Sequence, residues 1–277
     1  MVSPVLMFNY FFGSDLRSVQ YLDIINRNND YLNVITLPHK ISGRGRKLNP
    51  NPVEKFCIKN NIHFEYYDPN TVYENMSTGI CVSFGRIFSE TFLMKNKPIY
   101  NIHLSLLPSY RGPSPVEFSI LNEEKIVGFS VFEINNKIDD GKIVFQESFS
   151  IDSDTYASDI YDTIISLFDN KYKQISENLT PEKCKNEYKL SYTKKFIKND
   201  YNIFKHDVVT AKKMIRAFDV IGPAFLNYDE QIFKIHQYTE KKHAFPIELT
   251  DGILYPSIIT PQGKSKMKIE DYIRGNL

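Results

Sequence analysis

Tryptophan is absent from this chain of 277 residues, and cysteine occurs only three times. Cys57, Cys81 and Cys184 lie far apart and form no Cys-x-x-Cys pair. An odd number of widely spaced cysteines argues against a disulfide framework and a structural zinc site. The histidines also lack metal-ligand spacing, so no metal site is predicted. We therefore expect reduced, buried thiols and a reducing compartment.

The chain also lacks long hydrophobic runs and an excess of either charge. No apolar segment reaches the roughly 20 residues that cross a bilayer, so no membrane partner is expected. Neither a secretory peptide nor an Arg-rich transit peptide is visible at the N-terminus. Lys and Arg number 34 against 33 Asp and Glu. A polyanion would therefore have to bind at a local basic patch.

An apolar content of 42% is enough for a full hydrophobic core. In the first part of the chain, apolar runs that resemble strands alternate with segments of helical spacing, which is typical of an α/β fold with a largely parallel sheet. Strands are predicted at 5–12, 31–37, 63–67, 80–83, 99–103, 126–134 and 143–149. Helices are predicted at 16–25, 52–60, 90–95, 115–121 and 155–178.

The chain changes character after about residue 177, where a polar, Pro-containing stretch begins. We predict a first domain over 1–188, a linker over 189–207 and a second domain over 208–277. The second domain has one helical segment, followed by short strand-like segments separated by turn residues. This pattern predicts a small β-barrel. Its helix is expected at 211–218 and its strands at 224–227, 232–238, 245–249 and 254–259.

A polar set follows the predicted strand at 99–103. Asn101, His103 and Ser105 alternate, so on an extended backbone they would share one face. Asp139 lies on a later turn and could orient or charge the imidazole. Carboxyl ends of strands in open α/β sheets are where ligands bind, and this set suits chemistry on a carbonyl carbon. A merely solvated strand end is an equally good interpretation of the residues alone.

Two other segments could bind phosphate. Residues 43–47, Gly-Arg-Gly-Arg-Lys, place three cations in four positions beside flexible glycines, which would suit a phosphate backbone. A solvated charged run explains the same residues. Gly13-Ser14-Asp15 follows the first strand but lacks the dinucleotide-binding pattern, so a helix N-cap is the better interpretation.

Several segments together resemble one family, the methionyl-tRNA formyltransferases among the folate-dependent formyltransferases. Two of the stretches, Ser83-Phe-Gly85 and Tyr110-Arg-Gly-Pro-Ser-Pro115, resemble its mitochondrial members more than its bacterial ones. The catalytic signature is Asn101-Ile-His-Leu-Ser-Leu-Leu-Pro-Ser-Tyr-Arg-Gly112, and an acidic one runs from Gly128 to Gly141. The remaining segments of similarity are 11–15, 38–53, 82–87, 191–195, 215–218, 222–225 and 262–267.

The resemblance implies that the chain transfers the formyl group of 10-formyltetrahydrofolate to the α-amine of methionyl-initiator tRNA, for translation initiation. The implied catalytic residues are Asn101, His103 and Asp139. The implied folate contacts are Phe84, Gly85, Arg86, Ile87, Ser105, Leu106, Leu107, Pro108 and Asp139. The implied tRNA contacts are Gly43, Arg44, Arg46 and Lys47. No metal is implied.

The same resemblance implies a Rossmann-like formyltransferase domain followed by an OB-like β-barrel that binds tRNA. It further implies a monomer in the mitochondrial matrix, with a bacterial-type cytoplasm as the alternative. Two other functions remain open. A sugar-nucleotide N-formyltransferase would use the same folate donor and the same first domain. An RNA-binding relative without activity is the non-enzymatic alternative.

Overall fold

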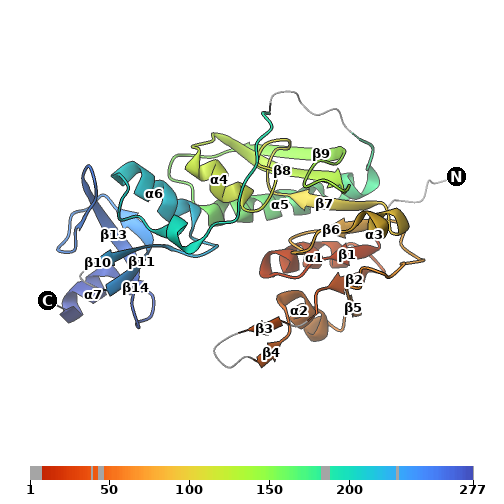
Figure 1. Cartoon of the computed structure of the whole chain (residues 1–277), viewed down its shortest axis with the longest axis horizontal. Coiled ribbons are helices and arrows are strands. Elements are labelled where there is room, and N and C mark those ends of the chain that lie inside the picture. The colour runs from red at the N-terminus through yellow and green to blue at the C-terminus, as the bar shows by residue number, and fades with distance from the viewer. Residues whose placement is uncertain (1–7, 39, 43–46, 182–187, 229–230, 277) are drawn as a thin grey trace. The chain divides into compact units, whose positions relative to one another are not determined.

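The structure is a computed structural model that describes residues 8–38, 40–42, 47–181, 188–228 and 231–276. Its largest sheet has seven strands in the order β5-β2-β1-β6-β7-β8-β9 (Figure 1). Five of them pair in parallel, and β8 runs antiparallel to β7. The predicted α/β fold with a largely parallel sheet is confirmed. The strands are β1 (Tyr10–Phe12), β2 (Asn33–Thr36), β5 (Phe64–Tyr66), β6 (Gly79–Cys81), β7 (Ile99–His103), β8 (Ile126–Glu133) and β9 (Ile143–Ser150).

Helices begin where short polar side chains cap them. The carboxylate of Asp15 accepts a hydrogen bond from the backbone amide of Ser18, and the side chain of Asn51 accepts one from the backbone amide of Glu54. Such caps satisfy backbone donors that have no partner inside the helix. The N-cap interpretation of Asp15 is thus confirmed. The helices of this part are α1 (Leu16–Arg27), α2 (Pro52–Asn60), α3 (Glu90–Lys95), α4 (Pro115–Leu121) and α5 (Ala157–Glu177).

Aromatic side chains cover both faces of the sheet. On one face, Phe12 of β1 lies edge-on to Phe92 of α3, with ring centroids 6.4 Å apart. On the other, Phe168 of α5 contacts Tyr21 of α1 and Phe129 of β8. A sheet covered on both sides has strands that read as continuous apolar runs, which is why they were visible in the sequence.

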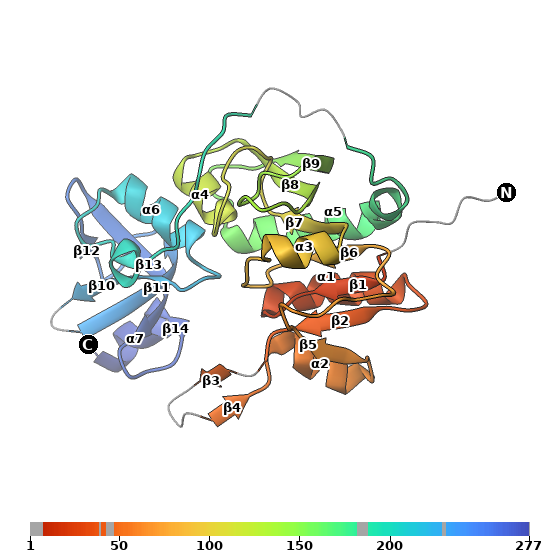
Figure 2. The same ribbon diagram turned by 45° about the vertical axis from the view of Figure 1, so that its right-hand side comes forward.

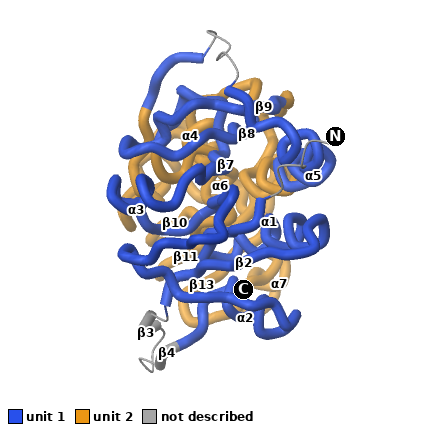
Figure 3. Tube along the Cα trace, turned by 90° about the vertical axis from the view of Figure 1, so that its right-hand side faces the viewer, with its two compact units in different colours: residues 1–111, 128–148, 163–191 blue, residues 112–127, 149–162, 192–277 orange. Residues whose placement is uncertain are grey.

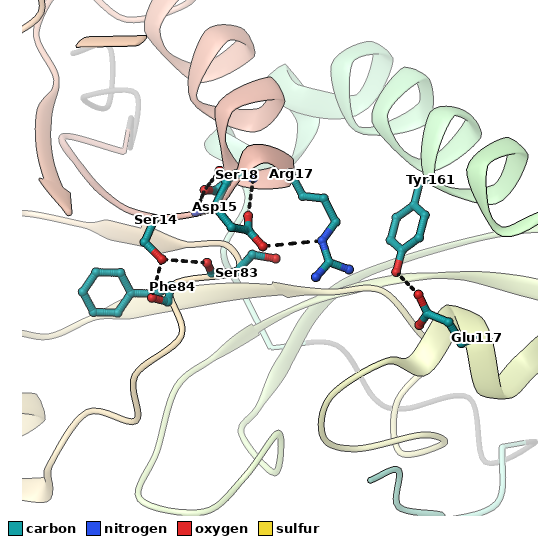
Figure 4. Close-up of polar contacts among 8 residues, drawn as sticks. All are labelled: Ser14, Asp15, Arg17, Ser18, Ser83, Phe84, Glu117 and Tyr161. Carbon is teal, nitrogen blue, oxygen red and sulfur yellow. Dashed lines mark hydrogen bonds and ion pairs between the residues drawn. The ribbon is translucent and has the colours of Figure 1, made fainter. Parts of the chain in front are cut away.

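The strand order reverses its direction of growth between β1 and β6. From β1 the chain proceeds to β2 and β5 on one side, and from β6 to β7 on the other. In open α/β sheets, ligands bind outside the carboxyl ends of the strands at such a point. Here the hydroxyl of Ser14, just after β1, donates to the carbonyl of Phe84 after β6 at 2.8 Å (Figure 4). This bond joins the two loops that flank the switch point.

The C-terminal strands form a separate five-stranded antiparallel sheet in the order β10-β11-β13-β12, with β14 paired to β13 (Figure 2). Inward-facing side chains such as Leu226, Phe233 and Ile259 are almost fully buried. The predicted small β domain is confirmed. Its elements are β10 (Ala224–Tyr228), β11 (Gln231–Thr239), β12 (Ile247–Glu248), β13 (Ile253–Pro261), β14 (Met267–Lys268) and α7 (Ile269–Asn276), preceded by the 3₁₀ helix η1 (Lys198–Tyr201) and by α6 (Val208–Ala217).

A strand pair and a helix correct the sequence interpretation. β3 (Lys40–Ser42) and β4 (Lys47–Asn49) form an antiparallel hairpin, although the segment from 43 onward was expected to be loop. Strands of three residues are too short for a recognisable period. The helix α7 was also missed, although Ile269, Tyr272 and Ile273 have helical spacing. The helix α7 packs against the sheet, and Tyr272 of α7 contacts Phe233 of β11 with ring centroids 5.5 Å apart.

The chain divides into two compact units (Figure 3). Unit 1 comprises residues 1–111, 128–148 and 163–191, and unit 2 comprises 112–127, 149–162 and 192–277. Both units draw on separate stretches of the chain, and the domain limits predicted from the sequence stay a prediction. Among the helices that the structure describes, none has the length and apolar character to cross a membrane.

Candidate functional site

His103 occupies the last position of β7 and is 6% exposed. Its Nε2 lies 2.8 Å from the carbonyl oxygen of Tyr110, and its Nδ1 lies 3.6 Å from Oδ2 of Asp139. A carbonyl oxygen only accepts hydrogen bonds, so Nε2 must be the donor. Nδ1 then faces a carboxylate. Each ring nitrogen therefore faces an oxygen acceptor, the Tyr110 carbonyl at Nε2 and the Asp139 carboxylate at Nδ1.

Asp139 lies on a tight turn between β8 and β9 and has a φ of 47°, in the left-handed region. Such a conformation in a non-glycine residue costs energy and occurs often at functional sites. The neighbouring Asp140 pairs with Arg111 at 2.5 Å, which ties the turn to the segment after β7. Gly141 completes the turn, because a Cβ there would lie 1.6 Å from the Glu133 carbonyl oxygen.

Asn101 lies two residues before His103 on β7, so the two side chains share a face. It is half-buried, and within the described part of the chain its side-chain amide has no hydrogen-bond partner. The amide is therefore available to donate to a ligand. Ser105 behaves differently, because β7 ends at His103 and the alternation does not extend to it. Its hydroxyl donates to the Ser109 carbonyl at 2.6 Å.

Two residues that the sequence interpretation missed hold the loop after β7. The Ser130 hydroxyl, fully buried in β8, donates to the Ser105 carbonyl at 2.6 Å and accepts the Leu107 amide at 3.0 Å. Gln146 of β9 donates from Nε2 to the Leu107 carbonyl and to Ser130 Oγ, both at 2.9 Å. The only signal in the sequence was a polar residue inside the apolar run of β8.

Residues of the loop after β6 differ sharply in exposure. The Phe84 ring is 2% exposed and stacks on Phe88, with centroids 5.3 Å apart. Gly85 has a φ of 77°, and both Arg86 and Ile87 are exposed. Of the four folate contacts predicted here, Phe84 therefore belongs to the core by its side chain. The other three face solvent and are accessible to a ligand.

The remaining predicted folate contacts lie in the loop held by Ser130. Leu106 and Leu107 are buried, and Pro108 is half-buried. Their backbone is fixed by the bonds described above, whereas their side chains belong mostly to the core. This loop is therefore suited to presenting backbone groups in fixed positions.

Cys81 ends β6 directly opposite Asn101 in the sheet register. Burial, followed by the negative charge of Asp139, raises the pKa of its thiol well above the usual range. A thiol that stays protonated is a poor nucleophile. Cys81 and Cys57 are both free and buried, as expected, and Cys184 lies outside the described residues. The site therefore contains no activated thiolate at Cys81.

The predicted basic segment is mostly beyond what the structure covers. Gly43, Arg44 and Arg46 lie outside the described residues, and Lys47 begins the backbone of β4. In the described ranges, no group of three or more His, Cys, Asp or Glu side chains is placed to hold a metal ion.

Comparison with known proteins identifies the family of the chain. The sequence profile of the formyl transferase family matches residues 12–174, more than half of the chain. This range begins at the last residue of β1 and includes the loops after β6 and β7 and the turn that carries Asp139.

Individual relatives narrow the class. The methionyl-tRNA formyltransferase of Thermosipho africanus (strain TCF52B) is 33% identical over 222 residues, which cover 76% of this chain and 72% of that protein. That of Clostridioides difficile (strain 630) is 26% identical over 284 residues, 91% of both. The chain therefore belongs to the formyl transferase family, in the branch of the methionyl-tRNA formyltransferases.

A solved structure has the same fold. The sugar 3N-formyl transferase WlaRD, crystallised in the presence of dTDP and 5-N-formyl-THF, superposes with a TM-score of 0.64. The match covers 94% of this chain and 99% of that one, at 24% sequence identity. This likeness concerns the fold. Both relatives compared above are bacterial, and the mitochondrial character expected from the sequence stays a prediction.

Proposed function

We propose that this chain transfers the formyl group of 10-formyltetrahydrofolate to the α-amine of methionyl-initiator tRNA. The observation that carries the proposal is the buried imidazole of His103, held between the Tyr110 carbonyl and the Asp139 carboxylate at the carboxyl end of the sheet. Formyl transfer needs hydrogen-bond donors at a developing oxyanion and a group that takes a proton from the attacking amine. Asn101, His103 and Asp139 supply these functions without a metal.

The reaction begins when the neutral amine attacks the formyl carbon. A carbon–nitrogen bond forms, and the carbonyl oxygen becomes an oxyanion that accepts hydrogen bonds from Asn101 and protonated His103. Asp139 stabilises the imidazolium and takes the proton that the amine loses, directly or through water. Collapse of the intermediate breaks the bond between the formyl carbon and N10 of the folate, and that nitrogen takes the proton back from Asp139, directly or through water.

The folate is proposed to bind across the loops that follow β6 and β7. Gly85, Arg86 and Ile87 are exposed and offer a surface on which a planar ring could lie, and the φ of 77° at Gly85 favours glycine, which adds no side chain there. The loop from Ser105 to Pro108 would supply backbone donors and acceptors. The bonds from Ser130 and Gln146 fix their positions.

The RNA end of the substrate is assigned to the basic segment, with Gly43, Arg44, Arg46 and Lys47 beside the acceptor stem. Cations so closely spaced bind phosphates without reading bases. Arg44→Ala should raise KM for methionyl-tRNA more than KM for the folate. An unchanged KM for the RNA would remove this segment from the binding surface.

Three further features are part of the proposal. Residues 1–188 are proposed to form the catalytic domain, 189–207 the linker and 208–277 the RNA-binding barrel. The protein is proposed to act as a monomer. Multi-angle light scattering would test this by measuring the molar mass of the protein in solution. The bacterial relatives named above favour a bacterial-type cytoplasm as the location. The mitochondrial matrix is the other location proposed. Fluorescent tagging of the protein in its host would decide the compartment.

The deciding experiment compares three acceptors under the same folate donor. Charged initiator tRNA should be formylated, while an amino-sugar nucleotide and charged elongator tRNA should not. Formylation of the sugar alone would replace the proposal with a sugar-nucleotide N-formyltransferase. Binding of RNA with no transfer to any acceptor would favour the non-enzymatic relative.

A further inference from the structure

Unit 2 contains a cavity of about 460 Å³ that the site in unit 1 does not use. This volume falls within the range of ordinary small-molecule pockets. Its lining comes from η1, from the turn before β10, and from strands β10 and β11. The lining residues, named here the barrel pocket, are Lys198, Tyr201, Ile221, Gly222, Pro223, Phe225, Ile232 and Lys234.

The walls of the barrel pocket are apolar and contain two aromatic rings. Phe225 and Tyr201 are both half-buried, so part of each side chain remains accessible. Gly222 has a φ of 143°, which requires glycine, and a Cβ there would approach the Tyr201 ring to 3.7 Å. Burial, followed by the charges of Glu117 and Asp200, raises the pKa of Tyr201. Its hydroxyl is thus a neutral donor at physiological pH.

Sheet register places a cation directly beside one of these rings. Phe225 of β10 pairs with Lys234 of β11, so the two side chains emerge on the same face. Phe233 and Ile235, the neighbours of Lys234, point into the core and are buried. Lys234 itself is exposed on the outer face. This face of the sheet therefore offers an aromatic surface and a positive charge side by side.

The charge at the rim of the barrel pocket comes from Lys198 and Lys234. Among the described residues, neither Lys198 nor Lys234 has an ion-pair partner. Other lysines of the same unit are paired, such as Lys212 with Glu240 and Lys194 with Asp200. The pairing of Asp200 also offsets its negative charge near Tyr201. An occupant of this pocket should therefore be planar, apolar on its faces and anionic.

We propose that the barrel pocket binds one unpaired nucleotide of an RNA, with its base against Phe225 and Tyr201 and its phosphate beside Lys198 and Lys234. Stacking on aromatic side chains combined with a positive groove is how proteins hold single-stranded nucleic acid. The inference rests on the proposed function for its RNA, because a tRNA substrate brings unpaired nucleotides to the protein. A free nucleoside monophosphate shares this chemistry, and the test separates the two sources.

The test measures binding to the full chain, without catalysis. The probes are uncharged initiator tRNA, a short single-stranded RNA carrying one 2-aminopurine, and AMP. The variants are Lys234→Glu and Phe225→Leu. Their matched controls are Lys241→Glu, an exposed lysine outside the pocket, and Phe204→Leu, an exposed aromatic outside it. Circular dichroism checks that each variant is folded. If Phe225→Leu does not fold, Lys234→Glu still tests the pocket.

The wild type should quench the 2-aminopurine on binding, as a stacked base does. Lys234→Glu and Phe225→Leu should each weaken RNA binding about tenfold, while the controls stay within about twofold. Lys234→Glu should also lower the slope of log affinity against log salt by about 1. Equal losses in Lys234→Glu and Lys241→Glu would overturn the proposal, because a general charge effect would explain both.

Two outcomes separate this inference from the proposed function. If the wild type formylates charged initiator tRNA but the pocket variants bind RNA normally, the barrel pocket is wrong and the function stands. If the wild type formylates no tRNA but binds RNA through the pocket, the function is wrong and the pocket stands. Saturation of the pocket by AMP with no competition from RNA would assign it to a free nucleotide and overturn the RNA assignment.

Discussion

One histidine in each unit shows how neighbouring charge decides what a similar side chain can do. His103 in unit 1 lies at the end of β7, with a carboxylate 3.6 Å from Nδ1 and a carbonyl 2.8 Å from Nε2. His236 in unit 2 lies within β11, where its Nε2 lies 2.9 Å from the Thr260 hydroxyl. Both rings are withdrawn from water to some degree, but the charges around them have opposite sign.

The consequence is clearest for His236. Burial, followed by the positive charges of Lys266 and Lys234, lowers the pKa of His236 to about 4. The ring is therefore neutral at physiological pH and serves as a structural hydrogen-bonding group. His103 instead has the Asp139 carboxylate beside Nδ1, at the site where the proposed mechanism develops an oxyanion. Partial burial alone does not make a histidine catalytic.

The largest effect on turnover is expected from substitutions that break the contact between His103 and Asp139 in unit 1. His103→Ala and Asp139→Asn should each lower kcat about 1,000-fold, because the first removes the donor and the second removes the charge that stabilises it. Single-turnover formylation measures the loss. His63 and Glu65 form a matched control, since they are also 3.6 Å apart but their side chains are 72% and 50% exposed. His63→Ala should leave kcat unchanged, and near-normal turnover of either site variant would show the roles to be misassigned.

Removal of the second donor should have a smaller effect. Asn101→Ala should lower kcat about 100-fold, with little change in either KM, because its amide bonds mainly to the transition state. Asn101→Asp, which keeps the shape but loses the donors and adds a negative charge, should be at least as impaired. If the loss appeared only in KM for the folate, Asn101 would bind the ground state and not the oxyanion.

Loss of the Ser130 hydroxyl, which anchors the loop after β7, should lower activity less than the substitutions above. Ser130→Ala leaves the Leu107 amide and Gln146 each without one partner in a buried region, which should cost about 1–3 kcal/mol of stability. Loosening the loop should also lower kcat/KM for the folate about tenfold. Ser119→Ala is the matched control, because within the described residues that buried hydroxyl bonds only to the Val116 carbonyl of its own helix. Equal activity losses in both variants would point to general destabilisation.

In unit 2, His236 is expected to make the free energy of unfolding depend on pH. The folded pKa of His236, about 4, lies below the ordinary value of 6.5, so the unfolded state binds a proton first as pH falls. Stability contributed by neutral His236 is thus present above pH 6.5 and is lost progressively down to about pH 4. His236→Gln should flatten the dependence of the unfolding midpoint on pH in this window. An unchanged slope would show that His236 is not the group responsible.

The smallest effect is expected from Cys81, next to the site but kept protonated by burial and by Asp139. Cys81→Ala should retain turnover within about twofold, since the proposed mechanism uses no thiolate. Alkylation of the wild type at pH 8, followed by mass spectrometry, should leave this residue unmodified. A large loss of activity in Cys81→Ala with a normal melting temperature would place the sulfur in the chemistry.

Local signals in the sequence were sufficient for much of the fold. α3, α4 and β7 have the bounds that periodicity, caps and flanking prolines predicted. In contrast, β3, β4 and β14 were missed, because two or three residues carry no period and their pairing depends on distant partners. The helix α7 has a visible helical spacing, but it is stabilised by aromatic contacts with strands far away in the chain.

The sequence by itself determined which residues could perform the chemistry, since Asn101 and His103 alternate on a strand and Asp139 lies on a glycine-containing turn. Only the tertiary structure decided that Asp139 meets Nδ1, that the Tyr110 carbonyl holds Nε2, and that the Phe84 ring is buried. It also revealed the anchoring role of Ser130. The physical reason is that a strand period is a local property, whereas hydrogen bonds and burial depend on which distant segments the sheet brings together.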